Sequence, residues 1–283
     1  LAMRIADWDA FPARKSEARA RGRLLGRGLA NYVESSIGAP RERAEMEILP
    51  EGRVRVVIGT QPSGQGHETS FGQVVASLLG VPLDAVDIVM GDTDIVTVGG
   101  GSHSGRSMRH AATVMSIGAR DLIAQGKALA SALFEVDGAD VEYQDGIFKV
   151  AGTDRRIDFL GLARESARRD PTARLATIAD NEMHDPVFPN GCAICECEID
   201  PETGALALTR YAAVDDVGRC INPMIVHGQT HGGIAQGVGQ ALWERCFVDP
   251  TSGQPLCGSL MDYALPHADQ LPMFETAIVE VLS

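Results

Sequence analysis

Apolar residues recur along the chain with two different periods, and each period predicts one kind of secondary structure. Alternating apolar positions at 46–48 and 54–58 predict a hairpin turned at Pro50-Glu51-Gly52. The following apolar positions have helical spacing, and the predicted helix ends at Gly80 and Pro82; its stripe is Phe71, Val74, Val75, Leu78 and Leu79. The first third of the chain therefore mixes strands with amphipathic helix.

The same patterns place elements over the rest of the chain. They predict helices at 12–21, 108–134, 158–169 and 223–243, a strand at 86–90, and hairpins turned at 145–146 and 200–204. Residues 170–191 are rich in Pro, Asp and Asn, which predicts a long connection. We expect an α+β fold of two related subdomains, 1–170 and 171–283, built from mixed sheets with packed helices. A strand-like run at 278–282 predicts a second subdomain truncated at its C-terminus.

Composition narrows the class of protein. The chain has 283 residues, a net charge of −13 and lysine only at Lys15, Lys127 and Lys149. It therefore lacks the basic face of a nonspecific nucleic-acid binder. No apolar run is long enough for a membrane-spanning helix and no export signal is visible, so we expect a cytoplasmic protein without a membrane span. Six cysteines are too few for a disulfide scaffold.

The 31 glycines gather in loops that suit an anion. In loop 63–67, before a predicted helix, they allow main-chain N–H groups to converge on a phosphate. Gln65 adds an amide that both donates and accepts, as the edge of a heterocycle requires. Loop 99–107 combines glycines, hydroxyls and Arg106 before the long helix, which favours phosphate or pyrophosphate. The alternatives are a glycine turn with a solvated Gln65 and a disordered linker at 99–107.

The predicted helix at 223–243 carries an unusual number of glycines. Gly232, Gly233, Gly237 and Gly239 together cost roughly 4 kcal/mol against alanine. We therefore expect close packing against another backbone or a flat ligand, with Gln236 on that side; a tight helix–helix contact without ligand is the alternative. The motif Gly228-Gln229-Thr230-His231 also echoes Gly64-Gln65-Gly66-His67, which favours two similar strand–loop–helix units over a chance match.

Metal sites and nucleophile triads find little support in the residues. Cys192, Cys195 and Cys197 lack a second pair at metal-ligand spacing. On a strand, Cys195 and Cys197 point away from the face of Glu196, and we interpret them as inward-facing free thiols. A non-haem metal site stays an alternative near the glycine loops, with His67, His103, His227 and His231 as its candidate ligands. The chain has no G-x-S-x-G elbow.

Several motifs, in order, resemble a known family. They are Gly59-Thr60-Gln61-Pro62-Ser63-Gly64-Gln65-Gly66-His67-Glu68-Thr69, Gly91-Asp92-Thr93-Asp94, and residues 99–109, 215–223, 228–237 and 258–263. The chain resembles the molybdopterin-binding large subunit of the xanthine dehydrogenase/aldehyde oxidase family, in the branch similar to the carbon monoxide dehydrogenase large subunit. The resemblance covers nearly the whole chain and corresponds to the C-terminal portion of that subunit.

The resemblance implies a molybdenum hydroxylase that acts on an aldehyde, N-heterocycle or similar small substrate. It implies a molybdenum–pyranopterin cofactor, in bacteria commonly molybdopterin cytosine dinucleotide, with FAD and [2Fe-2S] clusters on partner subunits. Further partners are the upstream half of the large subunit and, as an open option, a second copy in a homo-oligomer. By motif match, Gln236 is the catalytic residue near molybdenum, no residue ligates the metal, and the cofactor-binding residues are Gly64, Gln65, Gly66, His67, Ser104, Gly105, Arg106, Ser107 and Gln229.

Two parts of the family pattern are missing from these residues. The C-terminal glutamate motif that supplies the family's base is absent, and so is the upstream half of the large subunit. We therefore expect a cofactor-binding portion of an oxidoreductase that is inactive alone. One alternative is a noncatalytic structural or interaction fragment that folds without cofactor, and another is a nucleotide-phosphate-binding module unrelated to molybdenum.

Overall fold

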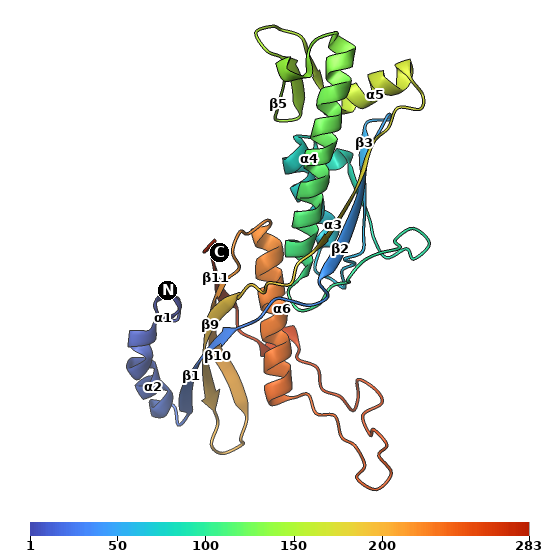
Figure 1. The fold of residues 1–283 in the computed structure, drawn as a ribbon. Helices are drawn as coiled ribbons and strands as arrows, with labels where there is room; N and C mark the ends of the chain where they lie inside the picture. Colours follow the sequence, from blue (N-terminus) through green and yellow to red (C-terminus); the bar gives the residue numbers. More distant parts are fainter. Residues whose placement is uncertain (283) are drawn as a thin grey trace. The chain divides into compact units, whose positions relative to one another are not determined.

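A computed structural model describes residues 1–282, and the chain divides into two compact units (Figure 1). Unit 1 comprises Leu1–Glu34 with the chain from Phe188 onward, and unit 2 comprises Ser35–Val187. This division differs from the predicted boundary between residues 170 and 171. The physical reason is strand pairing, because the first strand of unit 1 pairs along its length with the strand that begins at Asn190.

Unit 2 is built on a four-stranded sheet of order β4-β3-β2-β8. The strands are β2 (Arg41–Leu49), β3 (Arg53–Ile58), β4 (Val86–Val89) and β8 (Leu175–Glu182); β3 and β4 are parallel, whereas β2 is antiparallel to both of its neighbours. Helices α3 (His67–Leu79) and α4 (Ser107–Phe134) pack on this sheet and on each other (Figure 1). The predicted hairpin, helical stripe and long helix are confirmed.

The remainder of unit 2 lies directly before β4 and between α4 and β8. It contains a three-stranded antiparallel sheet, a helix and two short 3-10 turns: η2 (Leu83–Ala85), η3 (Gly138–Asp140), β5 (Val141–Gln144), β6 (Ile147–Val150), β7 (Arg156–Asp158) and α5 (Phe159–Arg169). Asp158 caps α5, as predicted, by accepting a bond from the Gly161 N–H. The predicted long connection at 170–191 is wrong, because β8 lies within it and buries Leu175 and Ala179 against the core.

Unit 1 has its own four-stranded sheet, of order β1-β9-β10-β11. Its strands are β1 (Leu24–Val33), β9 (Asn190–Ile199), β10 (Leu206–Asp216) and β11 (Phe274–Val279), and its helical segments are α1 (Ala2–Ile5), η1 (Trp8–Ala10), α2 (Phe11–Ala20), α6 (Pro223–Leu242) and η4 (Ala268–Gln270). Ala212 packs with α1 on one face, whereas Ala213, the next residue, packs with α6 on the other. Both faces of this sheet are therefore covered by helix.

The cover on both faces explains the positions of the β9 side chains. Glu196 is 1% exposed, and Arg14 of α2 binds its two carboxylate oxygens at 2.7 and 3.0 Å. The expectation of a single inward face is thus incomplete, because the glutamate face is also covered. Cys195 and Cys197 are free thiols on the opposite face, and burial raises the pKa of Cys195 to about 11.

The arrangement confirms the α+β class, with mixed sheets and packed helices in each unit. Among the residues that the structure describes, none of the helices is both long enough and apolar enough to cross a membrane.

Candidate functional site

The two glycine-rich loops of unit 2 meet at their bases. Loop 59–66 follows β3 and leads into α3, and loop 99–106 leads into α4. A Cβ placed on Gly59 would lie 2.2 Å from the Cα of Gly99. Any side chain at Gly59 would therefore push the two loop backbones apart.

A buried carboxylate ties the two loops together. Glu42 of β2 is fully buried, and its Oε2 accepts bonds from the Thr60 hydroxyl at 2.7 Å and the Gly100 N–H at 3.2 Å. The same oxygen accepts a bond from Arg106 Nη1 at 2.9 Å. One side chain thus holds a residue of each loop and the residue directly before α4. We call this group, formed by Glu42, Thr60, Gly100 and Arg106, the loop anchor.

Sequence reasoning missed Glu42, although the strand carries a signal for it. Along β2, residues 42, 44, 46 and 48 are buried and the intervening residues are more exposed. Glu42 therefore lies on the face of β2 whose side chains are buried, where a carboxylate must have a hydrogen-bonded partner. A charged residue that continues an apolar alternation is the pattern that identifies it.

Arg106 is also fully buried, and its whole guanidinium is engaged within unit 2. Besides Glu42, it donates to the carbonyl oxygens of Ala39 (Nε, 2.7 Å), Gly101 (Nη1, 2.7 Å) and Arg41 (Nη2, 3.0 Å). These contacts make Arg106 a positioning residue in this structure. Its predicted direct contact with a cofactor phosphate stays a prediction.

The other polar side chains of the loops form a second chain of contacts. His67 is 5% exposed; its Nδ1 donates to the Thr60 carbonyl at 2.9 Å, and Ser102 Oγ lies 3.4 Å from the same nitrogen. Ser107 Oγ donates to Ser102 Oγ at 3.0 Å. Burial lowers the pKa of His67, and its ring stacks on Phe71 with centroids 4.6 Å apart. The lowered pKa favours the neutral imidazole, and the contacts place His67 between the two loops; its predicted contact with the cofactor stays a prediction.

Two glycines of these loops have open space beside them. Gly64 has a φ of +109° and Gly101 one of +72°, and a Cβ at either position would meet no atom within 4 Å. Ser104 has a φ of +49° and its hydroxyl lies 3.2 Å from His103 Nδ1. The Gln65 side chain turns back to accept a bond from the Ser63 N–H. The predicted residues 64–66 and 104–106 therefore lie on two joined loops, and His67 and Ser107 are the first residues of the helices that follow; glycine backbone in such loops suits a flat or anionic ligand.

The other two predicted residues, Gln229 and Gln236, lie on α6 of unit 1. Asn222 caps this helix by accepting a bond from the Ile225 N–H at 3.1 Å, and Pro223 occupies its first turn. Both glutamines are exposed, while Ile234 and Val238 face the sheet. The predicted echo at 228–231 is thus inside a helix, whereas residues 64–66 precede one. The expectation of two like-built loops is wrong for the second copy.

The glycines of α6 line its open side. A Cβ on Gly232, Gly233 or Gly237 would meet no atom within 4 Å, and only Gly239 among the four is tightly packed, against Glu244 and Pro266. Helix–helix contact within the described chain therefore does not explain these three glycines. They leave a smooth helix surface on which Gln236 is exposed.

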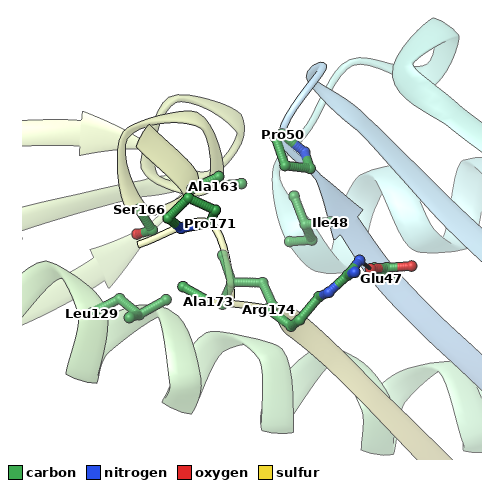
Figure 2. A pocket seen from close by; sticks show the side chains of 11 residues that line it. Glu47, Ile48, Pro50, Leu129, Ala163, Ser166, Pro171, Ala173 and Arg174 are labelled. Atoms are coloured by element: carbon green, nitrogen blue, oxygen red, sulfur yellow. Dashed lines mark hydrogen bonds and ion pairs between the residues drawn. The ribbon is translucent and has the colours of Figure 1, made fainter. Parts of the chain in front are cut away.

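Two further findings delimit the site. The cavity in Figure 2 has a volume of about 190 Å³ and is lined by residues of α4, α5, β2 and the segment before β8, with the Arg174–Glu47 ion pair among them. None of the predicted site residues lines it.

Within residues 1–282, His, Cys, Asp and Glu side chains form no group of three or more that could hold a metal ion.

Known proteins match both the sequence and the fold. The gamma subunit of the 6-hydroxypseudooxynicotine dehydrogenase complex of Paenarthrobacter nicotinovorans is 34% identical, over 99% of this chain and 36% of that protein. The carbon monoxide dehydrogenase large chain of Afipia carboxidovorans is 32% identical, over 93% of this chain and 34% of that protein. Quinoline 2-oxidoreductase from Pseudomonas putida 86 superposes with a TM-score of 0.89 at 33% identity, over 100% of this chain and 38% of that one.

The chain thus spans about a third of the length of molybdenum-dependent oxidoreductases, which confirms the resemblance and its restriction to a portion of the large subunit. The family described as the molybdopterin cofactor-binding domain matches residues 1–272. The chain therefore belongs to the molybdopterin cofactor-binding domain family.

Proposed function

We propose that the joined loops of unit 2 bind the phosphate-bearing part of a molybdenum–pyranopterin cofactor, and that Gln229 and Gln236 of α6 serve the same cofactor. The observation that carries this proposal is the loop anchor. Glu42 fixes both loop bases, while a Cβ at Gly64 or Gly101 would meet no atom within 4 Å, so there is space beside both glycines. A rigid base with glycine backbone that a ligand can approach closely is what binding of a flat, phosphate-bearing group requires.

The residues present fit such a group chemically. The loops offer main-chain donors and hydroxyls rather than lysine, and the loop 99–106 ends at the N-terminus of α4, where an anion is stabilised. When bound, a molybdenum–pyranopterin cofactor supplies oxidation–reduction chemistry. This chain contributes binding and orientation: the loops hold the cofactor, the bond from His67 Nδ1 to the Thr60 carbonyl keeps loop 59–66 in place, and Gln236 presents an exposed amide that donates and accepts.

We infer the role of the whole protein from its relatives. It would hydroxylate a small substrate such as an aldehyde or N-heterocycle, with the rest of the large subunit, an iron–sulfur subunit and an FAD subunit as partners in the cytoplasm. The cytosine dinucleotide form of the cofactor and a homo-oligomeric assembly belong to the same proposal. The 283 residues alone would not turn over substrate, because they cover about a third of each relative.

The test is cofactor content after expression of the chain together with a complementary upstream chain. Molybdenum is measured by elemental mass spectrometry, and pterin by fluorescence after release and oxidation. We expect both in the complex, and a marked loss in Gln65→Ala and Gln236→Ala. Gln240→Ala is the matched control, because Gln240 is exposed on the same helix.

The outcomes separate the competing functions. Absence of molybdenum and pterin in every pairing would overturn the proposal and favour a structural fragment that folds without cofactor. Tight binding of ATP or NAD by the chain, with no pterin, would favour a nucleotide-phosphate-binding module instead.

A further inference from the structure

Two cysteines lie on a short ribbon that follows α6. Val248 and Pro255 are antiparallel bridge partners, and the Asp249 N–H donates to the Gln254 carbonyl at 2.9 Å. The Gly253 N–H donates to the Asp249 carbonyl at 2.8 Å, which closes the turn. The register of the two strands is therefore fixed from the turn outward.

The register places Cys246 directly opposite Cys257. The Leu256 N–H donates to the Phe247 carbonyl at 2.7 Å, so these two residues form a hydrogen-bonded pair. The next pair outward, Cys246 with Cys257, is a non-hydrogen-bonded pair. Cα atoms in such pairs are about 4.5 Å apart, within the range of about 4.4–6.8 Å that a disulfide spans.

The side chains of this pair are already in contact. The two Sγ atoms lie 3.4 Å apart, Cys246 is exposed and Cys257 is half-buried. Both thiols are therefore within reach of a small reagent. A bond between them needs the sulfurs to approach from 3.4 Å to the ~2.05 Å of a disulfide, which rotation of the two side chains can supply at the backbone spacing that the register implies.

We propose that Cys246 and Cys257 form a reversible disulfide by exchange with a low-molecular-weight disulfide. The thiolate of one cysteine attacks a sulfur of the reagent, which breaks the reagent's S–S bond and releases one thiol. The second cysteine, as thiolate, then attacks the mixed disulfide and releases the second thiol. The protein loses two electrons and two protons, and the reagent gains them as two thiols.

The other cysteines of the chain provide the contrast. Cys195 is half-buried on β9, and burial raises its pKa to about 11. The hydrogen bond from Cys257 also raises the pKa of Cys246, so the contrast is that Cys246 is exposed and has a second thiol 3.4 Å away. A bond between Cys246 and Cys257 would link the two ends of the ribbon 246–257. This ribbon includes Phe247, Val248 and Leu256, which are 48%, 53% and 60% exposed. Oxidation would thus fix the backbone of an exposed apolar segment, and reduction would release it.

The test exposes the purified chain to oxidised glutathione and then identifies cysteine-containing peptides by mass spectrometry without reduction. We expect free thiols per chain to fall from six to four, with one cross-linked peptide pair that contains residues 246 and 257 and is reversed by dithiothreitol. Cys246→Ser and Cys257→Ser should each instead retain one glutathione adduct on the remaining thiol, because no second thiol resolves it. Cys220→Ser is the control and should still form the cross-link.

Two outcomes would overturn the proposal. One is a wild-type chain in which glutathione adducts accumulate separately on both cysteines. The other is a chain whose 246 and 257 thiols stay unmodified while Cys195 reacts. Neither depends on the cofactor, so the disulfide can fail or succeed independently of the proposed function.

Discussion

Replacing Glu42 by glutamine should loosen both glycine-rich loops at once. The carboxylate accepts bonds from Thr60, Gly100 and Arg106 on one oxygen, and Arg106 is fully buried. Glutamine keeps the shape and one acceptor oxygen but removes the negative charge. The Arg106 guanidinium would then be a buried cation without its partner.

The size of the effect follows from this burial. Removing one partner of a buried ion pair costs about 3–5 kcal/mol, because the other charge is left uncompensated. Arg106 still donates to three carbonyl oxygens in the variant, so we expect the lower end, roughly 3 kcal/mol. That is a large fraction of the ~5–15 kcal/mol that separates folded from unfolded domains.

The assays are urea unfolding and amide hydrogen exchange of the chain without cofactor. Exchange should accelerate in both 59–66 and 99–106 in Glu42→Gln. The matched control is Asp180→Asn, which breaks the exposed Arg41–Asp180 pair near the same strand and should change little. Adding Arg106→Met removes the orphaned charge, so the double variant should be no less stable than Glu42→Gln. Unchanged loop exchange, or strictly additive losses in the double variant, would refute the reasoning.

Three further predictions concern pH and glycine. Burial lowers the pKa of His110, so its neutral form is favoured in the folded state, and the free energy of unfolding should fall as the pH drops below the unfolded-state pKa of about 6.5. Chemical unfolding between about pH 7.5 and 5.5 measures this fall, and His110→Leu should weaken it. His184→Gln, at an exposed position, is the control and should leave the fall unchanged. Gly59→Ala should lower the melting temperature through a backbone clash worth roughly 1–3 kcal/mol, with Gly28→Ala, which meets open space, as the control; equal melting temperatures would contradict the close approach. Gly237→Ala should raise the stability of the chain by up to about 1 kcal/mol, yet lower molybdenum content in the complex if this face of α6 serves the cofactor.

Much of the fold follows from periodicity, and the two features that it did not predict have separate causes. The stripe that begins at Phe71 and the alternation of β2 are unambiguous because long runs repeat one period. Strand β8 was missed because only Leu175 and Ala179 are buried along it, between segments full of turn-forming residues. The division into units was missed because the pairing of β1 with β9 joins residues far apart in sequence, which no local pattern reports.

The sequence predicts the parts of the site in which glycines permit close approach of the backbone. It does not predict side chains whose partners lie far away in the sequence. Both loops could be found because bare backbone has a compositional signature. Arg106 was expected to face a phosphate, since an exposed arginine in a glycine loop commonly does so. Its burial follows from Glu42, more than sixty residues earlier in the chain, and this pairing is visible only after β2 and α4 are folded together.

The insertion of unit 2 within unit 1 gives the chain a modular construction. Val33 and Asn190 are partners at the ends of paired strands, and within unit 2 Ser36 and Val187 are bridge partners near its two ends. A tight turn joining β1 to β9 would therefore replace unit 2 without stretching the sheet of unit 1. Conversely, the segment 35–187 begins and ends at neighbouring points, as a transplantable piece does. Unit 2 is thus one continuous segment, whereas unit 1 becomes continuous only when such a turn joins its two parts.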